Sequence, residues 1–322
     1  MKRILVVHYS QTGQLSEVVR SFTQPLVAAP ELEVCFEPIA PVKPYPFPWP
    51  FFEFLDAFPE AVYEVPPPMR PLRVDASERF DLVILAYQAW FLSPSLPMTG
   101  FLQSDHAAKL LRDTPVITLI ACRNMWLMAQ EKVKRRLREI GATLIDNVAL
   151  VDAAGGAFSF IATPTWLLTG NKGPYLGGVV PAAGVAPEQI AAAARFGRRI
   201  VQALGAGELD TAPRSLLTGL GAVRINEKLI SGERIAHRSF LVWGRLLRAL
   251  GPAGAPRRRP VLALYSAFLV MMILTVVPLG ALLKQMILPF TREQVRRQKE
   301  YYAWPSGEQY AAELPLEPGP AS

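Results

Sequence analysis

The chain has 322 residues, which corresponds to one large domain or about two domains of ~150 residues each. Apolar residues make up 51% of the chain and charged residues 19%, with a net charge of +7, and this composition excludes an intrinsically disordered protein. The two cysteines, Cys35 and Cys122, exclude an extracellular disulfide scaffold, so we expect free thiols in a reducing compartment. Residues 1–7 hold too short an apolar run for a secretory signal.

Three apolar, β-branched runs and two weaker ones, at 33–37 and 147–151, predict the strands of one sheet, and helical patterns lie between them. The expected strands are residues 4–8, 33–37, 82–86, 116–121 and 147–151. The expected helices are residues 15–26, 96–103, 124–140 and 187–204. This alternation predicts an α/β domain over residues 1–205, with an open parallel sheet and helices on both faces.

Hydroxyl groups and a glycine follow the first expected strand, just before a helix begins. Hydroxyls and the free N–H groups of a helix N-terminus can together hold a phosphate, although Ser and Thr are also ordinary N-caps. The segment lacks both a P-loop and a dinucleotide fingerprint. Open parallel sheets bind ligands beyond the carboxyl ends of their strands. The predicted phosphate site therefore consists of Ser10, Gln11, Thr12, Gly13, Gln14 and Leu15.

Residues 38–71 hold eleven prolines and many aromatic residues. At this density of proline we expect no regular helix or strand. The segment is too apolar for a solvated linker, so we expect it to pack over the ligand site or to touch lipid.

Three later segments follow expected strands. Trp90 and Phe91 come after the strand at 82–86, and such rings either stack on a planar ligand or fill the core. Cys122, Arg123 and Asn124 come after the strand at 116–121, and the cysteine is either a reactive thiol or a packing residue. Residues 163–175 are expected to form a long structured loop, which is a common place for substrate contacts.

The C-terminal third combines a basic stretch with a long apolar run. Residues 206–259 form a predicted basic helical extension, since ten residues of 211–259 are Lys or Arg and two are Glu. Residues 261–283 carry no charge, and a helix of this length spans ~34 Å, against ~30 Å for the hydrocarbon core of a bilayer. We therefore predict a transmembrane or deeply embedded helix at 260–284, followed by a tail at 285–322.

The basic stretch favours an anionic membrane surface, so we expect anchoring at the cytoplasmic face of the inner membrane. A buried core helix is the alternative interpretation of the apolar run. Nucleic acid is a weaker candidate partner for the basic stretch, and we expect none.

The loop after the first strand resembles the phosphate loop of the flavodoxin-like family, a Ser/Thr-x-Thr-Gly-x-Thr-type turn around the phosphate of FMN. Ser10, Thr12, Gly13 and Gln14 match that pattern, whereas Leu15 stands where a last hydroxyl is common. The resemblance implies a flavodoxin-like sheet with bound FMN. It also implies that two later loops border the flavin ring, through Gln88, Ala89, Trp90, Phe91, Cys122, Arg123 and Asn124.

Four longer stretches resemble the proteins called dialkylresorcinol condensing enzymes, which accompany ketosynthases in bacterial aromatic-lipid pathways. These stretches are residues 45–52, 89–98, 121–126 and 163–170. The resemblance implies that a partner ketosynthase supplies a lipophilic 2,5-dialkylcyclohexane-1,3-dione, and that this chain oxidises the dione to a resorcinol with bound FMN.

Candidate catalytic residues follow from that implied chemistry. Arg123 is expected to hold the enolate of the dione while a hydride leaves the ring. Tyr87, His106 and His8 are the candidates for the base, and the sequence does not choose among them. No metal site is expected.

Three other functions stay open at this point. The first is an FMN quinone reductase fed by NAD(P)H. The second is a flavodoxin-like electron carrier, although such carriers are usually small, acidic and soluble. The third is a non-enzymatic membrane module that holds a ketosynthase.

Overall fold

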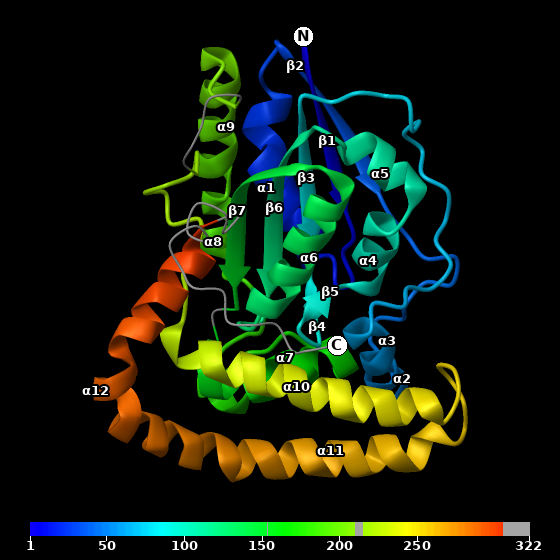
Figure 1. Ribbon diagram of the computed structural model, residues 1–322, viewed down its shortest axis with the longest axis vertical. Helices are drawn as coiled ribbons and strands as arrows, with labels where there is room; N and C mark the ends of the chain where they lie inside the picture. The colour runs from blue at the N-terminus through cyan, green and yellow to red at the C-terminus, as the bar shows by residue number, and fades with distance from the viewer. Residues whose placement is uncertain (153, 210–214, 305–322) are drawn as a thin grey trace.

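The five predicted strands form one parallel sheet. The structure is a computed structural model that describes residues 1–152, 154–209 and 215–304 (Figure 1). The strands are β1 (Lys2–His8), β2 (Leu32–Pro38), β3 (Leu82–Tyr87), β6 (Pro115–Cys122) and β7 (Thr143–Val151). They pair in the order β2-β1-β3-β6-β7, each parallel to its neighbours. Counted along the chain this order is 2-1-3-4-5, which is the flavodoxin-like order, so the predicted α/β architecture is confirmed.

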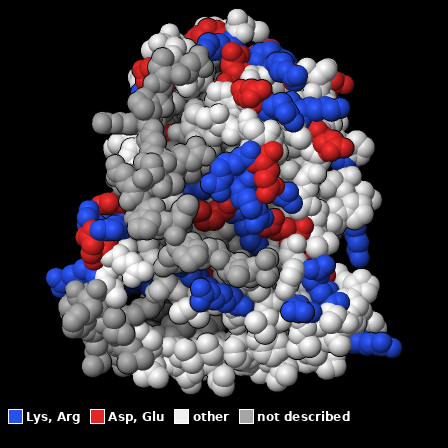
Figure 2. Space-filling model, in the orientation of Figure 1, with Lys and Arg blue, Asp and Glu red and all other residues white. Residues whose placement is uncertain are grey.

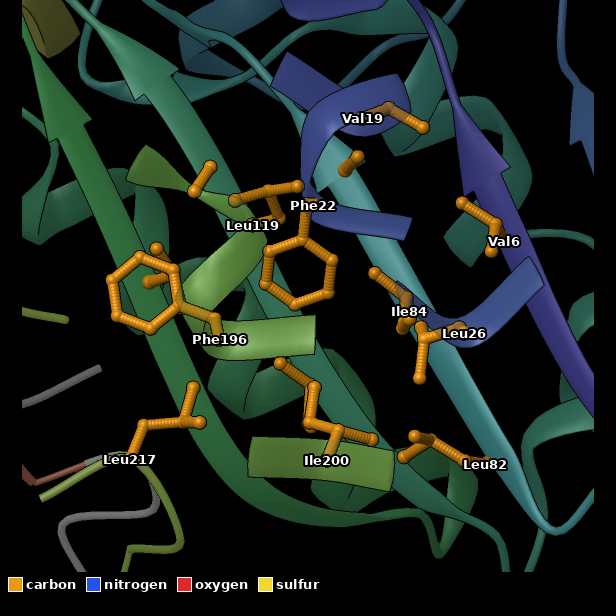
Figure 3. Packing of buried hydrophobic residues seen from close by; sticks show 14 of the residues in the cluster. Val6, Val19, Phe22, Leu26, Leu82, Ile84, Leu119, Phe196, Ile200 and Leu217 are labelled. Carbon is orange, nitrogen blue, oxygen red and sulfur yellow. The ribbon is translucent and has the colours of Figure 1, made fainter. Parts of the chain in front are cut away.

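Helices cover both faces of the sheet. On one face lie α1 (Gln14–Val27), α8 (Pro187–Ala192) and α9 (Ala194–Ala206), and on the other lie α4 (Leu96–Leu102), α5 (Asp105–Leu111) and α6 (Leu127–Ile140). Side chains from β1, β3, β6, α1 and α9 point toward one another in the first core (Figure 3). Gly197 brings α1 and α9 together, because a Cβ at this position would lie 2.1 Å from the carbonyl oxygen of Phe22.

The proline-rich insert forms two short helices, so the prediction that it contains none is wrong. They are α2 (Phe51–Asp56) and α3 (Phe58–Val62). Two prolines stand at the starts of these helices, where they do not interrupt them. Pro50 is the N-cap of α2, and Pro59 lies in the first turn of α3. A proline is tolerated there because the first N–H groups of a helix have no acceptor within the helix.

The prediction of a loop at 163–175 is also wrong, since residues 163–169 belong to a helix. Helix α7 (Gly155–Thr169) contains Pro164 and ends at Gly170, whose φ of +77° favours glycine. A single 3-10 turn, η1 (Leu176–Gly178), follows. Two short strands, β4 (Ala89–Trp90) and β5 (Ser93–Pro94), form a hairpin directly after β3.

The α/β core extends beyond residue 205, where the predicted domain ends. Leu209, Leu216 and Leu217 are buried in the core cluster of the sheet. The N–H of Ala149 on the edge strand β7 donates to the carbonyl of Ala222 at 2.9 Å. The segment at 215–222 therefore covers an edge that would otherwise expose unpaired backbone groups.

Three helices follow: α10 (Glu227–Ala249), α11 (Arg258–Leu274) and α12 (Val276–Ala303). Helix α10 lies in the predicted basic helical extension at 206–259, whereas α11 and α12 replace the single helix predicted at 260–284, because the backbone breaks at Thr275 between them. Within the described residues, no helix is both long and apolar enough to cross a bilayer. Helices α10 and α11 lie side by side below the ends of the strands to which the arrowheads point (Figure 1).

Candidate functional site

The loop between β1 and α1 presents backbone N–H groups at a helix start. Gly13 has a φ of +84°, a left-handed conformation in which glycine is favoured, and it caps α1. The Oγ of Ser10 accepts the N–H of Ser16 at 3.3 Å, which closes the loop around the start of the helix. The N–H groups ahead of Ser16, together with the half-buried Thr12, suit an anion.

Glutamines in and near this loop hold it to its neighbours. The N–H of Gln11 donates to Oε1 of Gln88 at 3.2 Å, and its Nε2 donates to the carbonyl of Pro46 at 2.6 Å. The Oε1 of Gln14 accepts the N–H of Val185 at 2.9 Å, and its Nε2 donates back to the Val185 carbonyl at 3.2 Å. The side chains of Gln11, Gln14 and Gln88 therefore join the first loop to the loop after β3, to the insert and to the segment before α8.

The two aromatic residues predicted to border a ligand diverge at the β4–β5 hairpin. Trp90 packs against Tyr45 and Trp49, with ring centroids 5.1 and 5.0 Å away, and against Tyr9 at 5.9 Å. Phe91, with a φ of +48°, turns the other way and packs on rings of α2, α3 and α10. Trp90 thus stays next to the first loop, whereas the structure does not bring the ring of Phe91 there.

Arg123 and Asn124 lie in the loop after β6 with buried polar atoms that lack partners. Among the described residues, Nε of Arg123 and Oδ1 of Asn124 have no hydrogen-bond partner. The guanidinium of Arg123 lies 3.9 Å from the ring centroid of Phe160 on α7. Burial lowers the pKa of Arg123 to about 10, so its charge remains at neutral pH. Buried polar atoms normally have partners, so these two indicate a ligand-binding position.

The neighbouring thiol does not have the properties of a reactive cysteine. Burial raises the pKa of Cys122 well above its ordinary value, and the carboxylates of Glu233 and Asp152 raise it further. Because the thiolate is the nucleophile, this shift disfavours a reactive thiol, and the half-buried Cys122 packs against the second core cluster of the sheet.

Asp152, which directly follows β7, is a site residue that the sequence analysis missed. Its Oδ1 accepts the N–H of Ala154 and its Oδ2 accepts the hydroxyl of Thr163, both at 2.7 Å. Its own N–H donates to the carbonyl of Cys122 at 3.0 Å. The carboxylate also favours the charged form of Arg123. An acidic residue at the carboxyl end of a strand was the available signal.

The three candidate bases lie in different environments. Tyr87 is fully buried, its hydroxyl donates to Oε1 of Gln130 at 2.6 Å, and burial raises its pKa, so it stays protonated at neutral pH. His106 lies on α5, with Nε2 2.7 Å from the carbonyl of Val74. Figure 1 places α5 toward the other end of the sheet, so the structure contradicts His106 as a catalytic residue. The helical turns of α4 and α5 carry it away from the strand ends.

His8 stands at the carboxyl end of β1, and its Nδ1 is buried without a partner among the described residues. Burial lowers its pKa, so the ring is neutral at pH 7. It lines a surface hollow of about 520 Å³ together with Arg20 and Phe36. His8 is therefore the only one of the three candidates that is both deprotonated and near the strand ends.

Four stretches that are distant in sequence converge near the carboxyl ends of the strands. In the insert at 45–52, the ring of Trp49 packs at a tilt against that of Trp90, and the Trp49 N–H donates to the carbonyl of Leu167 on α7 at 2.8 Å. Phe47 packs edge-on against Trp166 with centroids 6.3 Å apart. The stretch at 121–126 reaches α7 through Asp152 and through Arg123 above Phe160. The motifs at 45–52, 89–98, 121–126 and 163–170 thus belong to one region.

Comparisons with known proteins give structural similarity without a family assignment. No protein-family profile and no curated protein sequence matches the chain. A flavoprotein from Lactobacillus acidophilus in complex with FMN is 14% identical, with a TM-score of 0.38, over 46% of this chain and 93% of its own. The two-electron reduced flavodoxin of Megasphaera elsdenii is 18% identical, with a TM-score of 0.26, over 45% and 84%. These scores are low, so the fold assignment rests on the strand order.

Proposed function

We propose that the chain is an FMN-dependent oxidoreductase that converts a lipophilic 2,5-dialkylcyclohexane-1,3-dione to a resorcinol. One observation carries the proposal: the four motif stretches converge at the carboxyl ends of the strands, around the half-buried Arg123, which forms no ion pair with any of the described residues. Motifs that serve only local folding have no reason to meet at the ligand-binding edge of the sheet.

The residues at this edge fit FMN. Ser10, Thr12 and the first N–H groups of α1 would hold the phosphate, since hydroxyls and a helix N-terminus both favour an anion. The unpartnered atoms of Arg123 and Asn124 suit the polar edge of the flavin ring or the oxygens of a substrate. The order of the strands supports the same site, because flavodoxin-like sheets bind FMN at their β1/β3 switch point.

The proposed reaction removes one hydride and one proton from the dione ring, and no atom is added. Bound FMN supplies the two-electron acceptor, which a protein side chain cannot replace. Arg123 stabilises the negative charge on the enolate oxygen in a site of low polarity, where a fixed cation is most effective. Asp152 contributes by holding the loop of Arg123 and α7 together.

Aromatic residues of the insert support a lipophilic substrate. Tyr45, Trp49 and Trp90 form a contiguous group beside the first loop. Trp49 is buried behind the half-buried Tyr45 and Trp90, whose apolar surface suits alkyl chains, whereas the polar loops suit the ring oxygens. We propose a ketosynthase as the partner that supplies the dione, on the basis of the sequence resemblance.

The test uses the full chain, purified in mild detergent and loaded with FMN. Mixing it with the dione without oxygen should bleach the flavin once and form about one resorcinol per flavin. An alkylcyclohexanone, which lacks the second carbonyl, is the control and should leave the flavin oxidised. A protein that retains no FMN, or a dione that leaves the flavin oxidised, would refute the proposal. Reduction by NADPH alone with reoxidation by quinones would favour the reductase.

A further inference from the structure

The outer face of α11 is apolar over its whole length after the first turn. From Pro260 to Leu274 every exposed residue is apolar. Leu264, Val270, Met271 and Leu274 are 60, 56, 51 and 70% exposed. The exposed positions recur at the helical period, and the complete set is Pro260, Ala263, Leu264, Ala267, Val270, Met271 and Leu274. An ordinary surface helix carries charged and polar residues on this side.

The opposite face of α11 is fixed to the protein. Tyr265 stacks on Phe58 of α3, with ring centroids 4.7 Å apart and planes 8° apart. The buried guanidinium of Arg258 pairs with Glu60 at 2.7 Å and with Asp56 at 3.1 Å. Lipid therefore cannot surround this helix. At 17 residues its length is about 26 Å, shorter than the ~30 Å core of a bilayer.

Unpaired arginines flank the apolar face. Residues 234–274 contain no Asp or Glu. Arg238 and Arg245 are exposed on α10, and Arg257 and Arg259 are exposed at the start of α11. Within the described part of the chain, none of these four has an acidic partner. In Figure 2 the lower edge of the molecule, over α11, is white, and blue side chains lie just above it.

We propose that α11 lies on the surface of an anionic phospholipid membrane, parallel to its plane, with its outer face among the acyl chains and the four arginines at the headgroups. An apolar helical face bordered by basic residues is the pattern of an interfacial helix. A protein partner would need carboxylates to match the arginines, whereas anionic lipids supply the charge everywhere. The proposal is independent of the flavin chemistry, and it replaces the spanning helix expected from the sequence.

The first test measures binding of the full chain to sedimented vesicles of phosphatidylcholine, with and without phosphatidylglycerol. Val270→Glu should weaken binding at least tenfold, because it removes ~1.5 kcal/mol of apolar burial and adds a charge. Val27→Glu is the matched control, since Val27 on α1 is 58% exposed and Val270 is 56% exposed. Far-ultraviolet circular dichroism should show that both variants are folded.

A second pair of variants tests the contribution of charge. Replacing both Arg257 and Arg259 with glutamine should weaken binding to phosphatidylglycerol vesicles about thirtyfold, at ~1 kcal/mol for each basic residue. The control is Arg198→Gln on α9, which removes one exposed positive charge on another side of the fold and should change binding far less than half of the double variant's effect on a logarithmic scale. Binding to pure phosphatidylcholine should be weak for the unmodified chain and should change little in these variants.

The orientation is tested by spin labels at Leu264→Cys and Leu274→Cys. These positions are ten residues apart, about 15 Å along the helix. A helix in the membrane plane places both labels at the same shallow depth, whereas a spanning helix separates them. Burial raises the pKa of both Cys35 and Cys122, so the exposed cysteines should react first.

Three outcomes would overturn the proposal. The full chain could fail to bind either type of vesicle, or Val270→Glu could bind as well as Val27→Glu. The unmodified chain could also form a dimer that Val270→Glu dissociates without any vesicle binding, and the apolar face would then be an interface between two copies.

Discussion

Because of Glu233, the free energy of unfolding of this protein should decrease as the pH rises, in a range where most carboxylates are already ionised. The side chain of Glu233 is fully buried on α10. Oε1 accepts the N–H of Met128 at 2.8 Å, at the start of α6, whereas Oε2 has no partner among the described residues. Burial raises its pKa from 4.5 to about 7.

The folded state therefore retains a proton that the unfolded state has already lost. The stabilisation of the folded state that comes from this bound proton is complete below pH 4.5, and it declines as the pH rises until the pH passes the folded pKa of about 7. With 1.36 kcal/mol for each pKa unit, the free energy of unfolding should fall by about 3 kcal/mol over this range. Above pH 7 the effect should be constant.

The measurement is urea unfolding at several pH values, on the full chain and on Glu233→Gln. Glutamine keeps the acceptor for Met128 but does not ionise, so the difference between the two proteins isolates this one group. Asp146, whose pKa burial also raises, contributes equally to both proteins and cancels. At low pH the two proteins should differ little in stability, because the protonated carboxyl and the amide both leave a buried donor without a partner among the described residues. A difference that does not change between pH 4.5 and 7 would refute this reasoning.

Three further predictions concern the site and the core. Replacing both Ser10 and Thr12 with alanine should weaken FMN binding at least tenfold, at ~1.5–3 kcal/mol for each hydrogen bond to a charged group, and unchanged retention by equilibrium dialysis would contradict it. Arg123→Leu should slow turnover of the dione more than it weakens FMN binding, and Arg123→Lys should recover part of the rate; an equal loss of both properties would assign the arginine to the cofactor alone. Leu217→Ala should destabilise the α/β core by ~2–5 kcal/mol in urea unfolding, because this residue beyond position 205 is fully buried, and a loss below about 1 kcal/mol would place it outside the core.

The sequence by itself determined the sheet and the loops that border the site. Apolar, β-branched runs predicted the three central strands β1, β3 and β6, because strands buried on both faces need apolar side chains at every position, and weaker patterns predicted the edge strands β2 and β7. Since parallel strands end at one edge, the residues after β1, β3 and β6 were predictable as neighbours. The local pattern also predicted the start of α1 after the loop that contains Gly13, whereas the left-handed conformation of this glycine came from the structure.

Tertiary packing decided what local pattern could not. Helices α2 and α3 form in spite of their prolines because the aromatic residues of the insert are buried against α10 and α11. Phe91 turns away from the first loop into that same cluster, and the path of α4 and α5 carries His106 from the strand ends. The break at Thr275 divides an apolar run that, read as a sequence, is long enough to span a membrane.

The same contrast holds for individual site residues. Only the structure identifies Asp152 as a site residue, because its carboxylate accepts the hydroxyl of Thr163 and its N–H donates to the carbonyl of Cys122. The motifs were visible in the sequence, but their distances were not, because each contact joins segments that only the completed fold brings together. Composition and period therefore determined the strands and the helices that flank them, whereas long-range packing determined α2, α3 and which side chains face the site.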